Sequence, residues 1–110
     1  MLTFSEEAMM NQQQLMQQAR KLQAQLAKIQ EDLGRETVVG SASSGAVEVT
    51  LNGHGNVDRI KVAPAAVDPN DLETLEDLLV IAFKDAQAKV AQLSQARMGP
   101  LAGGLGLPGM

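Results

Sequence analysis

Apolar residues in the first third of the chain recur with alternating spacings of four and three, the pattern of one stripe along a helix. The helix is predicted to begin near Ser5, a suitable N-cap, and to end at Gly34, which favours a left-handed stop. A helix of about 30 residues is ~45 Å long, whereas a compact globule of this chain length measures ~34 Å across. Its own chain cannot cover the whole stripe, so we favour a homodimer with protruding helical arms. The dimerisation residues expected on this coiled-coil-like stripe are Leu15, Leu22, Leu26, Ile29 and Leu33.

Three short segments after this helix have the alternation and turn signals of β-strands. They span residues 36–43, 46–52 and 57–63, and they are separated by a Ser-Ser-Gly turn and by the Gly-rich turn "NGHGN". Turns this short predict an antiparallel meander with one buried face. The side chains expected on that face of the second and third strands are Val47, Val49, Leu51, Ile60 and Val62.

A second helix is predicted from Asp68, the expected N-cap, with Pro69 at its first position and Asp71 at its third, to the residue before Gly99-Pro100. It supplies the cover that a lone three-stranded sheet needs. Leu78 and Ile81 widen its apolar stripe, which indicates burial on more than one side of its first half. The stripe itself contains Leu72, Leu75, Leu79, Ala82, Phe83, Ala86, Val90 and Leu93.

The predicted fold class is therefore α+β, a two-layer α-β-β-β-α arrangement. Residues 1–98 are expected to form a single domain, and residues 99–110 a Gly/Leu/Pro-rich tail. The chain of 110 residues has no cysteine, which excludes disulfides and thiolate metal sites. We expect no signal peptide and no membrane helix.

The sequence contains few residues that could support catalysis. His54 is the sole histidine, and its place in the Gly-rich turn indicates a solvated turn residue rather than a metal ligand or general base. The chain lacks a phosphate loop and a nucleophile elbow. We therefore expect no enzyme activity, no cofactor, no metal and no small-molecule substrate.

Charge is distributed unevenly around a formal net value of −4. Residues 68–83 hold five acids and no base, whereas residues 12–30 hold three bases and no acid. On the first helix, Lys21, Lys28 and Arg35 repeat every seven residues, with Arg20 beside them. Such a line can neutralise phosphates, and the neighbouring glutamines can add hydrogen bonds. The solvated outer face of a dimerising helix explains the same spacing, so both interpretations stay open. The scarcity of aromatic residues favours duplex over single-stranded nucleic acid.

Several segments in this order resemble the YbaB/EbfC family of bacterial nucleoid-associated proteins. The resemblance rests on the Met/Gln-rich first helix, "VTLNGHGNV", "LEDLLVIAFKDA" after an Asp-Pro, and the closing "GGLGLPG". It implies a cytoplasmic, nucleoid-associated homodimer that holds double-stranded DNA between helical arms. The DNA-binding candidates that it implies are Arg20, Lys21, Lys28 and Arg35, followed by Lys84, Lys89 and Arg97.

The function expected is duplex binding with limited sequence preference, contributing to nucleoid organisation and gene regulation. The alternative is a protein-interaction module that acts through the acidic residues 68–83 or through the C-terminal tail.

Overall fold

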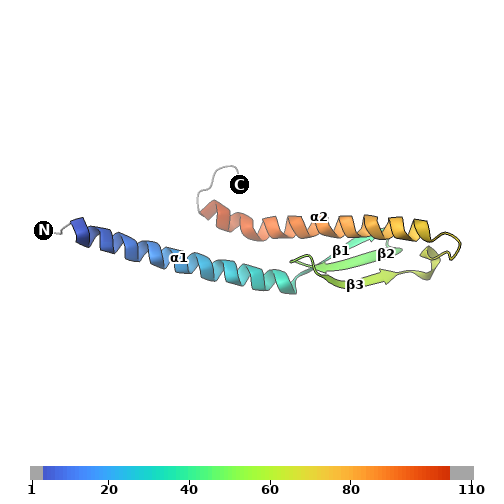
Figure 1. The fold of residues 1–110 in the computed structure, drawn as a ribbon, viewed down its shortest axis with the longest axis horizontal. Coiled ribbons are helices and arrows are strands. Elements are labelled where there is room, and N and C mark those ends of the chain that lie inside the picture. The colour runs from blue at the N-terminus through green and yellow to red at the C-terminus, as the bar shows by residue number, and fades with distance from the viewer. Residues whose placement is uncertain (1–3, 105–110) are drawn as a thin grey trace. The chain divides into compact units, whose positions relative to one another are not determined.

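The computed structural model describes the backbone of residues 4–104 and the side chains of residues 11–101. Two compact units, residues 1–31 and 32–110, divide the chain. Figure 1 shows the order of helix, three antiparallel strands and helix that the sequence predicts, so the α+β fold class is confirmed. A short 3₁₀ turn, η1, was not predicted. The elements are α1 (Phe4–Arg35), β1 (Thr37–Ala42), β2 (Val47–Asn52), β3 (Val57–Val62), η1 (Pro64–Ala66) and α2 (Leu72–Gly104).

Helix α1 continues one residue past its predicted end. Gly34 lies within the helix, and the N–H of Glu36 donates to the carbonyl of Asp32 at 3.0 Å, so the helical pattern persists through Arg35. Among the described residues, the glycines with positive φ are Gly45 and Gly55, so the predicted left-handed stop at Gly34 is wrong. The proposed N-cap hydroxyl of Ser5 lies outside the described side chains.

The sheet has the strand order β1-β2-β3, with both pairs antiparallel. Val47, Val49 and Leu51 alternate along β2 and are fully buried, as their spacing predicts. The Ser-Ser-Gly turn before β2 places both serines and the glycine at positive φ. The "NGHGN" turn is also confirmed, because the Asn52 side chain accepts hydrogen bonds from the N–H groups of His54 and Asn56.

Helix α2 packs over β1 and β2 at very close range (Figure 1). Ala82 and Ala86 are fully buried there and face Gly40 of β1. A Cβ atom at Gly40 would lie 2.7 Å from the Ala86 Cα and still closer to the Ala82 carbonyl oxygen. Small residues on both sides thus let the helix backbone approach the strand, and the larger Leu75 and Leu79 fill the space beside them.

Strand β3 is less covered than its alternation predicts. Ile60 pairs with Val49 and so shares the helix-facing side of the sheet, yet it is 45% exposed, and Val57 is 53% exposed. The prediction that Ile60 is buried is therefore wrong. One helix is about as wide as two strands, and α2 lies over the other two.

Three predictions about α2 also need correction. The helix begins at Leu72, and its N-cap is Asp71, whose carboxylate accepts the Thr74 N–H at 3.3 Å; Asp68 instead caps the preceding turn through Asn70. The helix runs through Gly99 and Pro100 to Gly104, so its predicted end before Gly99-Pro100 is wrong, although both residues disfavour a helix interior. Ile81 is 53% exposed, so the first half of α2 is buried on one side only. The rest of the predicted tail, residues 105–110, lies outside the described residues.

Candidate nucleic-acid interface

The polar face of α1 carries exposed cations. Among the side chains described in residues 11–31, none is buried. Arg20, Lys21 and Lys28 are exposed, and within the described part of the chain no hydrogen bond or ion pair holds their head groups. Seven helical residues separate Lys21 from Lys28, about 10.5 Å along the axis. Long cationic side chains in this state are free to meet phosphate.

Arg35 differs from these three. It lies in the last turn of α1 and is exposed, but it already interacts with another group of the chain. It stays a candidate contact whose side chain must exchange partners before it can reach phosphate.

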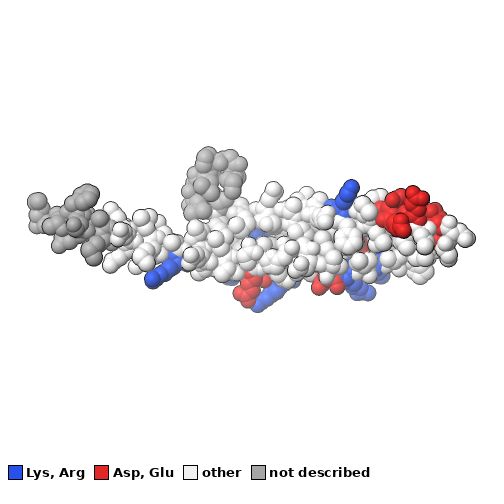
Figure 2. Space-filling view, viewed as in Figure 1, with Lys and Arg blue, Asp and Glu red and all other residues white. Residues whose placement is uncertain are grey.

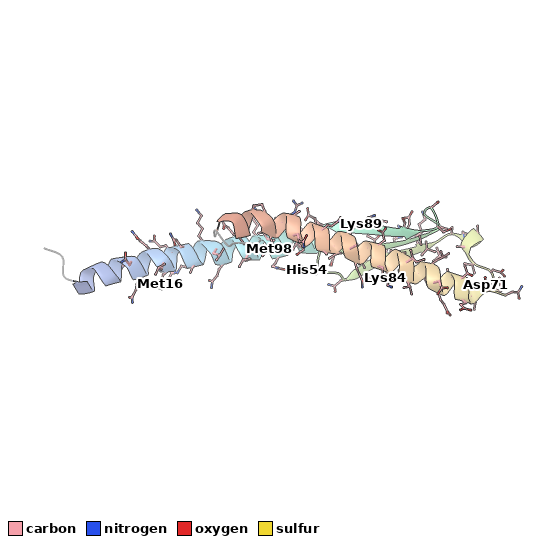
Figure 3. The ribbon with its side chains drawn as sticks, turned by 90° about the horizontal axis from the view of Figure 1, so that it is seen from above. Met16, His54, Asp71, Lys84, Lys89 and Met98 are labelled. Carbon is pink, nitrogen blue, oxygen red and sulfur yellow. The ribbon has the colours of Figure 1, made fainter. Side chains whose placement is uncertain are left out.

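Lys89 of α2, labelled in Figure 3, is bonded to β1, an edge strand of the sheet. Its Nζ donates to the Val39 carbonyl at 2.7 Å and lies 3.4 Å from the Asp85 carboxylate one helical turn earlier. The Asp85 carboxylate accepts the Ser41 N–H at 3.0 Å, and this bond, together with Lys89, lowers the pKa of Asp85. Two side chains of α2 therefore satisfy β1 backbone groups that face away from β2.

Arg97 is held by Glu36, the residue between α1 and β1. Its Nε donates to one carboxylate oxygen at 2.9 Å, and its Nη2 donates to the other. This fork lowers the pKa of Glu36 and raises that of Arg97. Both Lys89 and Arg97 were predicted as second-rank DNA contacts, and the structure gives both an intramolecular partner.

Three further cations are exposed on the second unit. Lys84 projects from α2 (Figure 3), as expected of a second-rank candidate. Arg59 and Lys61 of β3 were not among the predicted contacts. They alternate with Ile60 and Val62 and pair with Thr50 and Glu48 of β2 on the face away from α2.

Comparison with known proteins adds to this geometry. The model of the YbaB/EbfC DNA-binding family matches residues 9–105. The chain belongs to the YbaB/EbfC DNA-binding family. It is 51% identical over 100 residues to a nucleoid-associated protein of Roseiflexus castenholzii, covering 91% of this chain and 99% of that one. It is 50% identical over 93 residues to one of Corynebacterium glutamicum, covering 84% and 90%.

The fold has a solved counterpart in an uncharacterized protein of Helicobacter pylori, HP0035. The two chains superpose with a TM-score of 0.70 at 16% identity, covering 92% of this chain and 98% of that one. Identity this low supports the shared fold alone.

In this YbaB/EbfC chain, the residues predicted for dimerisation fall into two groups. Leu15 is 64% exposed, and Leu22, Leu26 and Ile29 are partly exposed along α1. Leu33 is 2% exposed because it packs within its own chain, beneath Gly53. The first four are available to a second chain, whereas Leu33 is already covered.

Figure 2 shows acidic side chains gathered where α2 begins. Two of them have local structural roles: Asp71 caps the helix and also accepts the Thr74 hydroxyl at 2.6 Å, and Asp68 caps the turn before it. All members of this acidic patch are exposed: Asp68, Asp71, Glu73, Glu76 and Asp77.

The remaining chemistry is sparse across the residues that the structure describes. They contain no group of three or more His, Cys, Asp or Glu side chains arranged to hold a metal ion. His54 lies in the β2–β3 turn, as predicted (Figure 3). None of the described helices has the length and apolar character to cross a membrane.

Proposed function

We propose that this protein binds duplex DNA as a homodimer with limited sequence preference, by neutralising phosphates along α1. One observation carries the proposal: Arg20, Lys21 and Lys28 are exposed and have no ion-pair or hydrogen-bond partner among the described side chains, on a helix segment, residues 12–30, that contains no acid. Membership of a DNA-binding family supports it. Phosphate contacts carry little sequence information, so limited preference follows from the same mechanism.

Localisation in the cytoplasmic nucleoid, with a part in its organisation and in gene regulation, belongs to the same proposal. The relatives from Roseiflexus and Corynebacterium are named nucleoid-associated proteins, which supports it. Binding that depends on the backbone of DNA suits a protein that occupies many sites.

The homodimer is proposed on the apolar side of α1. Leu15 and Met16 are 64% and 56% exposed, and a second copy packed along the stripe removes that surface from water. Two copies also double the number of cations that one duplex meets.

A gel-shift titration against salt tests the DNA-binding proposal. If four to eight phosphates are contacted per dimer, the logarithm of affinity falls with the logarithm of salt concentration with a slope of roughly −4 to −7. A flat dependence would rule out phosphate neutralisation. Sequence preference is read in the same assay from unlabelled competitor duplexes of differing composition.

The second candidate is a protein-interaction module that uses the acidic patch at the start of α2. Its exposure and its concentration at one end of α2 favour a basic protein surface as partner. Partners recovered by pull-down before and after nuclease treatment separate the candidates. Partners that persist after nuclease, and that are lost when Glu73 and Glu76 are replaced by glutamine, support this second function.

A further inference from the structure

The last turn of α1 packs against the turn between β2 and β3. The Gly53 N–H donates to the Leu33 carbonyl at 2.8 Å and to the Glu36 carbonyl at 3.0 Å. A Cβ atom at Gly53 would lie 2.9 Å from the Leu33 Cα, so only glycine permits this approach. The His54 ring lies over Gly34, with two of its atoms 3.3 Å from the position of a Cβ there. The turn thus satisfies a carbonyl at the end of a helix, a group that helices leave unpaired.

Arg97 reaches the same place from α2. Its guanidinium forms a two-pronged hydrogen bond with Glu36, although the two residues are 61 positions apart in sequence. Glu36 directly follows α1, and its carbonyl is one of the two acceptors of the Gly53 N–H. A fork of this kind fixes orientation as well as distance. Contacts from the β2–β3 turn and from α2 therefore converge on residues 33–36.

From this convergence we infer that Arg97 is a positioning residue for DNA binding and not a phosphate contact. It acts through Glu36 to hold the last turn of α1 in the β2–β3 turn. The inference about DNA rests on the proposed function, in which α1 carries the contacts. Because α1 is one continuous helix from Phe4 to Arg35, an anchor at its last turn restrains the helix that bears Arg20, Lys21 and Lys28. Restraint before binding lowers the ordering cost at binding.

Removal of the Glu36 carboxylate distinguishes the two roles by the sign of its effect. If Arg97 contacted phosphate, Glu36→Ala would release it and remove an acid, and DNA affinity would rise. A positioning role predicts that Glu36→Ala lowers affinity roughly two- to fivefold, the effect expected of an exposed ion pair. Glu73→Ala is the matched control, because it removes an exposed acid from the start of α2 and leaves Glu36 intact. A rise in affinity for Glu36→Ala that exceeds the rise for Glu73→Ala overturns the inference.

Arg97→Ala sharpens the distinction through its salt dependence. A lost phosphate contact flattens the salt slope by about 0.9 for each phosphate. A lost anchor lowers affinity and leaves the slope unchanged. The charge swap Glu36→Arg with Arg97→Glu keeps the pair and is expected to restore affinity toward that of the parent protein. A flattened slope for Arg97→Ala, or a swap no better than the single variants, counts against positioning.

Amide hydrogen exchange tests the anchor without DNA. Arg97→Ala is expected to increase the exchange rate of the Gly53 N–H roughly two- to fivefold, the range of an exposed ion pair. The Asn52 N–H, bonded to the Asn56 carbonyl at 2.9 Å in the same turn, is the internal control and is expected to keep its rate. An unchanged Gly53 rate overturns the anchor even if DNA binds. If the parent protein binds no duplex, the proposed function fails while this measurement still decides the anchor.

Discussion

The two helices of this protein are nearly equal in length, 32 and 33 residues, yet they differ in how much of their surface is buried. Helix α2 buries Ala82 and Ala86 against Gly40 and thereby completes the core. Helix α1 has no buried side chain between residues 11 and 31, and its cations Arg20, Lys21 and Lys28 are unpaired within the described part of the chain. Length alone therefore says little about the role of a helix. The size of the residues that face the sheet distinguishes the helix that completes the core. The partners of the charged residues distinguish the helix that we propose for DNA binding.

The largest expected effect is on stability, at the close packing of α2 against β1. Gly40→Ala places a methyl group against the α2 backbone, which forces the helix away from the sheet. We expect the free energy of unfolding to fall by about 3 kcal/mol, the upper range for overpacking, as measured by urea denaturation. Ser41→Thr is the control: it also adds one methyl group to β1, but at an exposed position, and is expected to change stability by less than about 0.5 kcal/mol. Equal effects of the two would mean that α2 does not pack closely on Gly40.

The next largest effect is expected on dimerisation, through the apolar side of α1. Leu15→Asp places a charge in the proposed dimer stripe of both copies, and we expect the dimer dissociation constant to rise roughly a hundredfold, since burying a leucine contributes about 1.5–3 kcal/mol. Sedimentation equilibrium measures this constant. Val80→Asp is the matched control, because Val80 is 51% exposed but lies on α2. A dimer that survives Leu15→Asp and dissociates on Val80→Asp would move the interface to α2.

The cations of α1 are expected to affect binding but not stability. Lys21→Ala with Lys28→Ala should weaken duplex binding roughly tenfold or more and flatten the salt slope by about 0.9 for each lost contact. Unfolding free energy should change by less than about 0.5 kcal/mol, because both side chains are exposed. Arg59→Ala with Lys61→Ala removes the same charge from β3 and serves as the control. Equal losses in the two pairs would show that net charge, not α1, governs binding.

The smallest expected effect is a loss of stability at low pH, which arises from two carboxylates that bond to α2 or belong to it. Hydrogen bonds and nearby cations lower the pKa of both Glu36 and Asp85. A carboxylate with a lowered pKa in the folded protein contributes stability above its ordinary pKa and loses it as the pH falls through the lowered value. We therefore expect a small decrease in the urea midpoint as the pH falls below about 4. Glu36→Gln with Asp85→Asn should reduce this decrease, and an unchanged pH profile would show that these two carboxylates are not its source.

Much of the fold follows from local pattern. The strict alternation of β2 places Val47, Val49 and Leu51 in the core, and the spacing of apolar residues marks both helices. The exposure of Ile60 does not follow from pattern, because it depends on where α2 lies across the sheet. The start of α2 at Leu72 does not follow either, because Asp68 and Asp71 are both good caps, and only the chain path from η1 decides between them.

The candidate site divides in the same way. Heptad spacing alone identifies the exposed line of Lys21 and Lys28. The bonds from Lys89 to Val39 and from Arg97 to Glu36 join residues 50 and 61 positions apart in sequence, which no local pattern contains. The pairing of Lys89 with Asp85 is local, because the two residues are one helical turn apart. The position of Glu36 gave a weak indication of an ion pair, because it is an acid directly after a helix that carries cations. Arg59 and Lys61 alternate with Ile60 and Val62, which were expected on the buried face, and nothing in their spacing related them to DNA.

The bonds from Asp85 and Lys89 to β1 also limit how the protein can assemble. Uncontrolled growth of β-structure requires each added sheet to offer a fresh edge to the next, so two usable edges are needed per molecule. The Ser41 N–H and the Val39 carbonyl are already bonded, so the β1 edge is less available for such pairing than the β3 edge. We therefore expect strand pairing between molecules to favour the β3 edge and to stop at two copies. The same two bonds therefore disfavour fibre growth through the sheet of this protein.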